Sequence, residues 1–379
     1  MKYCSKCLIP DTRPDQIFDR HGVCNACISH ELKKKIDWSA RQKELDSIID
    51  KIKKSDNKWN CVIPSSGGKD STYQAVWAKK RGLNPVLVTA STCDLSNVGR
   101  KNIENLKNIG FDTVEISTNA VIRKKLNKIS LETIGDISWP EHVSIFTAPI
   151  KFALSYKIPL ILYGENPQLE YGGPQSSLNN SILDRKWMEE FGGLIGFRVN
   201  DLKENYGFCS SDLNIFEYPT EEELKKFKIK SLFLGYYEKW DPYRNYDTAK
   251  KNGFENYNGD LEGCYFNWEK IDNYQHGIHD YFKYLKFGFG RATDQLSYLI
   301  RSKKISREVA VGKVKNLEGS FPVSYMGKSL EDILKKIDIS MEDFKKICDR
   351  FTNKKIFECD QGGNLSFDDK GNLIKKINF

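Results

Sequence analysis

The chain has 379 residues, of which 39% are hydrophobic and 12% aromatic, so it can hold two or three domains and is not a disordered chain. Its longest apolar runs, such as residues 158–163, are far too short to span a bilayer, and residues 1–4 carry no apolar signal region. We therefore expect a cytoplasmic protein without membrane contact. The net charge of +8 suits anionic ligands such as ATP and permits RNA binding without requiring it.

Four of the ten cysteines are spaced like metal ligands, and ten cysteines in a cytoplasmic chain do not indicate a disulfide framework. Two residues separate Cys4 from Cys7 and Cys24 from Cys27, so each pair presents two sulfurs from one tight turn. We predict a structural metal site in a zinc-ribbon-like module over residues 1–30, because four thiolates leave no position open for catalysis. Zinc is the better candidate, iron is the alternative, and four free thiols in a loop is the remaining interpretation.

Strands alternate with helices after this module. A charged amphipathic helix over residues 31–54 comes first. The pattern then predicts strands at 61–64, 85–89, 113–116 and 158–163, and helices at 72–81, 97–109, 121–134 and 144–156. Such alternation indicates an α/β fold with a parallel, doubly wound sheet, here over residues 31–175.

A mainly helical, aromatic-rich region is predicted for residues 176–379, which we expect to complete the α/β core and to contact substrate or partner. Helices are expected at 295–302, 306–317 and 329–351. Within it, Lys283, Arg291, Thr293 and Asp294 lie close to two glycines and predict a substrate-contact turn. Two histidines in the same region, His276 and His279, lack an obvious third metal ligand, so a polar or core role is favoured over a metal site.

The segment Ser65-Ser66-Gly67-Gly68-Lys69-Asp70-Ser71 lies between the first strand and the helix after it. A glycine-rich turn that opens a helix directs backbone N–H groups and the helix dipole at an anion. The run is not a Walker A loop, because Asp70 follows Lys69 where that motif needs Ser or Thr. It is similar to the SGGxDS pyrophosphate loop (PP-loop) of ATP pyrophosphatases, which cleave ATP between the α and β phosphates.

Other loops join this one at the carboxyl ends of the parallel strands, where ligands of such sheets bind. They are residues 89–94, 117–119 and 164–173. The expected nucleotide contacts are Ser65, Ser66, Gly67, Gly68, Ser71, Thr89, Gly164 and Glu165. Glu165 and Glu170 are candidates for metal or amine contacts, with ordinary solvated loop acids as the alternative.

Nearly the whole chain resembles the N-acetyl sugar amidotransferases of the pseudaminic acid and lipopolysaccharide type. The resemblance lies in residues 4–14, 22–27, 64–71 and 287–294. It implies an adenine nucleotide α-hydrolase-like PP-loop fold and a role in surface-glycan or flagellin-glycan biosynthesis. The implied reaction turns an acetamido group of a nucleotide-activated sugar into an acetamidino group through an O-adenylyl imidate, releasing AMP and pyrophosphate.

The resemblance also suggests cofactors and roles. ATP and Mg²⁺ would be used at the loop and Zn²⁺ held structurally. Lys69 would neutralise phosphate charge, Asp70 would orient Mg²⁺–pyrophosphate, and Ser71 would help hold the pyrophosphate.

Ammonia is expected from a partner glutaminase, which the resemblance also implies. An N-terminal nucleophile glutaminase needs cysteine at position 2, where Lys2 stands, and Cys264 lacks the Gly-x-Cys-x-Gly setting of the other class. The alternative function is a tRNA-modifying PP-loop enzyme of the thiolase or lysidine-synthetase type, for which Cys93 is the candidate thiol, although a buried inert thiol is favoured there. We do not expect a nucleic-acid partner, because no region shows clear clustering of basic charge.

Overall fold

The computed structural model describes the chain except for residues 55–57, 167–169, 171–180, 184–195 and 378. Its centre is a five-stranded, all-parallel sheet with the order β3-β2-β1-β4-β5. The strands are β1 (Cys61–Pro64), β2 (Pro85–Ala90), β3 (Asp112–Ile116), β4 (Leu160–Tyr163) and β5 (Lys230–Phe233). The expected doubly wound α/β fold is confirmed. The strand order reverses between β1 and β4, which is where such sheets open a crevice for ligands.

Helices cover both faces of this sheet, as its alternating side chains require. Cys61 and Ile63 pack with Leu45 of α2 (Trp38–Lys53) and Ala78 of α3 (Lys69–Lys80). On the opposite face, Val62 packs against α6 (Trp139–Tyr156). The helices α4 (Asn97–Asn108) and α5 (Ala120–Ile134) complete this half of the chain.

The fifth strand comes from the second half of the chain and was not expected as a strand. Four residues, Lys230 to Phe233, pair in register with β4. Residues before it form α9 (Val199–Tyr206), α10 (Ser210–Leu213) and α11 (Glu221–Phe227). Two further helices follow it, α12 (Leu234–Tyr237) and α13 (Pro242–Lys251), and α13 packs along α3. The α/β core therefore continues well past residue 175.

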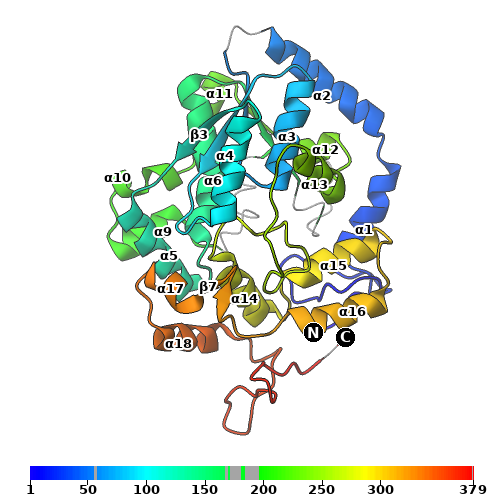
Figure 1. The fold of residues 1–379 in the computed structure, drawn as a ribbon, viewed down its shortest axis with the longest axis vertical. Coiled ribbons are helices and arrows are strands. Elements are labelled where there is room, and N and C mark those ends of the chain that lie inside the picture. The colour runs from blue at the N-terminus through cyan, green and yellow to red at the C-terminus, as the bar shows by residue number, and fades with distance from the viewer. Residues whose placement is uncertain (55–57, 167–169, 171–180, 184–195, 378) are drawn as a thin grey trace.

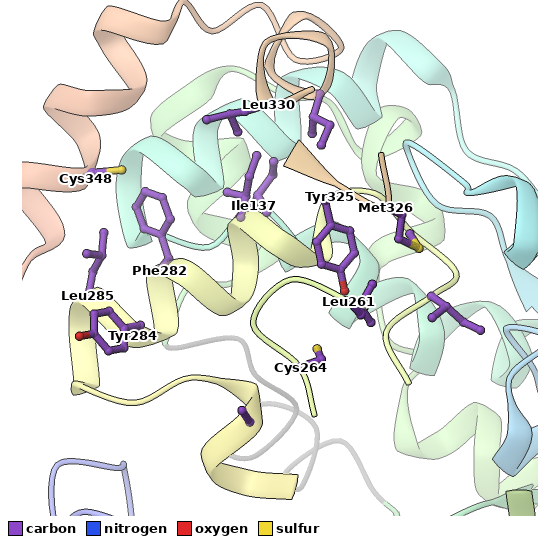
Figure 2. Close-up of a cluster of buried hydrophobic side chains, with 14 of the residues drawn as sticks. Ile137, Leu261, Cys264, Phe282, Tyr284, Leu285, Tyr325, Met326, Leu330 and Cys348 are labelled. Carbon is purple, nitrogen blue, oxygen red and sulfur yellow. The ribbon is translucent and has the colours of Figure 1, made fainter. Parts of the chain in front are cut away.

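The C-terminal region has its own hydrophobic core, built around α14 (His276–Phe287), α15 (Arg291–Arg301), α16 (Arg307–Leu317), α17 (Leu330–Lys335) and α18 (Met341–Phe351). Figure 2 shows Phe282 of α14 among these side chains, with Ile137 from the α5–α6 connection beside it. A short hairpin of β6 (Ser324–Tyr325) and β7 (Lys328–Ser329) adds Tyr325 to the same core. This core thus ties the α/β half to the C-terminal helices (Figure 1).

Two helix boundaries differ from expectation for local reasons. The single helix expected over 329–351 is two helices, because Asp338 adopts a positive φ of 52° and Ser340 caps a new helix by accepting from the Asp343 N–H. The helix expected over 31–54 is α1 (Asn25–Leu32), a 3₁₀ turn and then α2, whose start Asp37 caps.

The N-terminal cysteine module packs on the C-terminal region. Phe289 lies fully buried in the same cluster as the four cysteines. The Leu8 N–H donates to Ser297 Oγ at 3.2 Å, and Arg307 Nε donates to the Cys7 carbonyl at 3.3 Å. The segment 287–301 therefore lies between the ribbon and the rest of the molecule. Within the described residues, no helix has the length and apolar character needed to cross a membrane.

Truncating Phe282 tests the importance of this shared core. Phe282 is 1% exposed, and Phe282→Ala should destabilise the fold by about 3–5 kcal/mol because it leaves a cavity among packed rings. Urea unfolding followed by tryptophan fluorescence measures the change. Val309→Ala, at a side chain that is 53% exposed on α16, is the matched control and should shift stability little. Equal effects of the two substitutions would contradict this description of the core.

Candidate active site

The PP-loop connects β1 to the first turn of α3. Ser65 N–H donates to the Val88 carbonyl of β2 at 2.9 Å, which holds the loop on the sheet edge. Inside the loop, Ser65 Oγ accepts from the Gly67 N–H at 3.1 Å and donates to Ser71 Oγ at 3.0 Å. Ser71 Oγ in turn donates to the Gly68 carbonyl. These bonds fix the turn and leave the start of α3 as an anion site.

Gly67 is required at its position. Its φ is +78°, and a Cβ there would lie 2.8 Å from the Ile103 nitrogen of α4. Only glycine allows this close approach of loop and helix.

Lys69 and Asp70 start a chain of alternating charges. Lys69 Nζ lies 2.6 Å from Asp70 Oδ2 and 3.2 Å from Glu269 Oε1, and it sits 5.1 Å from the centre of the Trp268 ring. Burial disfavours the charged lysine, yet the two carboxylates raise the pKa of Lys69 above its ordinary value. Asp70 Oδ1 also accepts from Asn245 Nδ2 of α13 at 2.9 Å.

The chain continues into the C-terminal region through Glu269. Its Oε2 accepts from Arg291 Nη2 at 2.8 Å and from Gln295 Nε2 at 2.9 Å. Burial alone would raise the pKa of Glu269, but Lys69 and Arg291 lower it to about 2. Arg291 lies 3.9 Å from Asp294 Oδ2, and the same oxygen pairs with Lys283.

A cavity of about 190 Å³ opens over this chain of charges. Its walls combine the PP-loop with loops from the second half of the chain. Lining residues include Ser66, Gly67, Gly68, Lys69, Asp70, Asn102, Glu165, Glu170, Trp240, Trp268, Glu269, Lys270, Arg291, Asp294, Gln295 and Tyr298. A tight anion loop thus faces aromatic, carboxylate and guanidinium groups across one space.

A second cavity, of about 290 Å³, adjoins the first, and both are lined by Ser66, Lys270 and Asp272. Its other walls are the ends of β1, β2 and β4 and the start of α6, with apolar contacts from Val88, Ile145, Phe146 and Tyr163. Four lining side chains in the described part of the chain carry buried polar atoms without a hydrogen-bond partner: Thr92, Ser138, His142 and His276. The second cavity therefore combines apolar walls with polar atoms that have no partner in the described part of the chain.

Lys270 lies where the two cavities meet. It adopts a φ of +60°, which is uncommon for a residue with a side chain. Among the described residues, no carboxylate lies within ion-pair distance of its ammonium group. Strained backbone of this kind concentrates at functional sites, and the sequence analysis did not single out this lysine.

Glu165 and Glu170 both line the first cavity. Burial raises the pKa of Glu165 to about 7, with Asp70 adding to the rise and Lys69 opposing it. Glu170 pairs with Lys33, and its carbonyl accepts from Arg301 Nη2 at 3.2 Å. Most of the 164–173 loop that was expected to approach a ligand, Gly172 and Gly173 included, lies outside the described residues.

The remaining predicted residues are placed differently. Thr293 lies fully buried behind the cavity and bonds Glu318 through Oγ1 at 2.9 Å. Lys283 is turned to Asp294 and to the Gly290 carbonyl, and Thr89 is buried within β2. None of these three lines the first cavity. Gly164 packs against Trp240, where a Cβ would lie 3.1 Å from the indole.

Cys93, the thiol on which the alternative thiolase function depends, has no activated environment. Burial and the neighbouring Glu141 raise its pKa to about 11. A thiol with a raised pKa is a weak nucleophile at neutral pH.

The four N-terminal cysteines form one buried cluster. Cys4 Sγ lies 3.9 Å from Cys27 Sγ, and Cys7 Sγ lies 3.6 Å from Cys24 Sγ. Sulfurs around a tetrahedral ion with bonds of about 2.3 Å are about 3.8 Å apart, so the spacing fits one metal ion. Backbone N–H groups of Lys6, Cys7 and Cys24 point at Cys4 Sγ, as they do around a metal-bound thiolate.

The comparisons with known proteins bear on the second half of the chain. Residues 235–370 match the C-terminal domain of WbpG-like LPS biosynthesis proteins. This segment contains α13 to α18 and supplies Glu269, Lys270 and Arg291 to the cavity.

Other similarities are more distant. An uncharacterized protein of Methanocaldococcus jannaschii is 29% identical over 109 residues, and the match covers 28% of this chain and 38% of that protein. Two solved structures align with a TM-score of 0.28 each. A predicted subunit of tRNA methyltransferase from M. jannaschii is 16% identical, with 62% of this chain and 92% of that chain covered; NMN synthetase from Francisella tularensis is 14% identical, with 56% and 96% covered. Scores this low say nothing about the reaction.

The raised pKa of Glu165 predicts a pH dependence of stability. The carboxyl has a pKa of about 7 in the folded protein against an ordinary value of 4.5. The folded state therefore holds the extra proton between these values, and its stability falls as pH rises from about 4.5 to 7. Glu165→Gln should remove this loss, so that the variant gains about 2 °C or more in Tm over the wild type at pH 8 and nothing at pH 4.5.

Differential scanning fluorimetry without Mg²⁺ measures this difference. Glu342→Gln, at a side chain that is 80% exposed, is the control and should change the Tm little, because exposed ion pairs contribute little to stability. A Glu165→Gln shift that does not grow with pH would contradict a carboxyl that keeps its proton up to about pH 7.

Proposed function

We propose that this protein is an AMP-forming, ATP-dependent amidotransferase that converts the acetamido group of a nucleotide-activated sugar to an acetamidino group in surface-glycan biosynthesis. The observation that carries the proposal is the shared cavity. One wall of the cavity is the PP-loop. The other wall lies in residues 235–370, which match a lipopolysaccharide-biosynthesis domain. A substrate bound by the second half of the chain would therefore lie next to an ATP bound at the PP-loop.

In the first step the amide oxygen of the sugar attacks the α-phosphorus of ATP. An O–P bond forms, the α–β anhydride bond breaks, and pyrophosphate leaves. The backbone N–H groups of the PP-loop and the first turn of α3 hold the pyrophosphate. Lys270 stabilises charge where the cavities meet, and the adenosine occupies the second cavity beside Val88 and Tyr163.

In the second step ammonia attacks the imidate carbon, and the bond to the adenylyl oxygen breaks so that AMP leaves with that oxygen. One proton departs from the nitrogen, and a carboxylate with a pKa near 7 is suited to take it. Glu165 is that carboxylate. A separate glutaminase is proposed as the ammonia source, because none of the cysteines has a glutaminase setting.

Two metals belong to this proposal. Asp70 would supply an oxygen ligand of the kind that Mg²⁺ uses when it accompanies ATP, which leaves Glu165 free to take the proton. The four-cysteine cluster would hold Zn²⁺ as a structural ion, which supports the segment 287–301 that carries Arg291.

The reaction is tested with purified protein, ATP, ammonium and a panel of nucleotide-activated acetamido sugars, with bulk tRNA as the competing substrate. We expect AMP, pyrophosphate and a sugar in which NH replaces the amide oxygen, identified by mass spectrometry. Asp70→Asn should lower kcat/KM by about 100-fold or more, because it removes a charge that orients the metal and Lys69. Asp50→Asn, on the exposed face of α2, should leave the rate unchanged. AMP release that requires tRNA would assign the protein to base modification instead.

Zinc in the ribbon is tested by metal analysis. Cys24→Ser should remove one equivalent of zinc and lower the thermal midpoint, because a small ribbon holds its shape only with the ion. Cys209→Ser, at an exposed cysteine, is the control and should keep both the zinc content and the thermal midpoint of the wild type. Iron in place of zinc, or an unchanged metal content in Cys24→Ser, would overturn this part of the proposal.

A further inference from the structure

Asp136, His142 and His279 form a second cluster of metal-ligating side chains, remote in sequence and chemistry from the cysteines. Asp136 lies between α5 and α6, His142 in the first turns of α6, and His279 in the first turn of α14. The two imidazoles approach the two oxygens of one carboxylate. His279 Nδ1 lies 2.8 Å from Asp136 Oδ1, and His142 Nδ1 lies 3.2 Å from Asp136 Oδ2.

Hydrogen bonding does not fully account for this cluster. Asp136 is 2% exposed, yet its Oδ2 atom has no partner of hydrogen-bond geometry, and neither has His142 Nδ1, although the two lie in contact. Among the described residues, no lysine or arginine reaches ion-pair distance of this carboxylate. A buried carboxylate without a full cation is costly, and a divalent ion would compensate it.

The donor set and spacing fit a transition metal. Two imidazole nitrogens and one carboxylate suit Zn²⁺ and its neighbours, whereas Mg²⁺ and Ca²⁺ prefer oxygen alone. Ligand atoms about 2.0–2.1 Å from a tetrahedral ion are about 3.3 Å apart. The three residues offer atoms that all lie within 4.8 Å of one another, so a modest contraction brings them to that distance.

The surrounding structure holds Asp136 in place. Asp136 Oδ1 accepts from the Ser138 N–H at 2.9 Å, and Asn127 Nδ2 donates to the Ile137 carbonyl at 2.6 Å. Ile137, which follows Asp136, and Phe282, on the same helix as His279, pack in the shared core of Figure 2. A rigid carboxylate with supporting bonds is what a preformed metal site needs.

One side of the cluster is open. The side chains of His142 and His279 are 23% and 21% exposed, and His142 lines the second cavity together with His276. Three protein ligands leave a fourth position, as in zinc sites that bind water or substrate. Of the three ligands, His142 is the one that lines the second cavity, so it places one edge of the cluster there.

We propose that Asp136, His142 and His279 bind one divalent transition-metal ion and leave one coordination position open to the second cavity. The two imidazoles and one carboxylate favour Zn²⁺. The ion joins α6 of the α/β half to α14 of the C-terminal region. This site is independent of the proposed reaction, since its occupancy is measured without ATP or sugar.

Metal stoichiometry tests the proposal on the full chain. Protein stripped with chelator, reloaded with Zn²⁺ and dialysed against a weak competing chelator should retain two equivalents, measured by mass spectrometry of the metal. His279→Ala should retain one. His276→Ala, one turn away on the same helix and bonded to Asp272, should retain two. Cys24→Ser should also retain one, which separates the two sites.

Co²⁺ loading identifies the ligands. In Cys24→Ser, the remaining Co²⁺ should show visible bands of a nitrogen–oxygen site without sulfur charge transfer. His142→Ala, whose side chain is partly exposed, provides a second variant if His279→Ala does not fold, and it should also lose this signal. A single equivalent in the wild type, or two equivalents in a folded His279→Ala or His142→Ala, would show that the cluster is only a hydrogen-bonded group.

Discussion

The buried pairing of Lys69 with Glu269, and of Glu269 with Arg291, is the interaction on which the site depends. Lys69 begins α3 directly after the PP-loop, and Arg291 begins α15 in the C-terminal region. Removing one partner of such a buried pair leaves a charge without compensation, typically at a cost of about 3–5 kcal/mol. The pairing therefore fixes the distance between the anion loop and the second half of the chain, and with it the width of the cavity.

The N-terminal ribbon packs against the helix that carries Arg291. Arg291 follows the segment that packs on the cysteines through Phe289, and Arg301 at the end of α15 lies 4.0 Å from Cys7 Sγ. A metal in the cysteine cluster would hold both ends of α15, and hence one wall of the cavity. A structural ion far from the reacting atoms would thus still control the geometry that they meet.

Local patterns in the sequence were enough to predict the α/β fold, the first four strands and the PP-loop, because each depends on neighbouring residues. Long-range partners were not predictable in this way. Glu269 and Lys270 lie in a charged stretch without a motif, and they matter only because folding places them opposite Lys69. The carboxylate partner of His279 is Asp136, 143 positions earlier in the chain, and the second histidine of the cluster is His142, so the spacing of His276 and His279 did not predict the cluster. Thr293 shows the reverse case. It lies within a conspicuous motif, but its hydroxyl donates to Glu318 and it does not line the first cavity.

The balance of charges in the first cavity determines which groups can attract an anion. Lys69, Arg291 and Lys283 are each already paired with a carboxylate, so they contribute little free positive potential. The positive end of α3, which lines the first cavity, and the ammonium of Lys270, which lines both cavities, remain. In the proposed reaction these two positive groups would hold the phosphate chain. In this reaction the paired ions would set the shape of the site, whereas the helix terminus and one lysine would set its affinity for phosphate. The demands of stability would then be separate from those of binding.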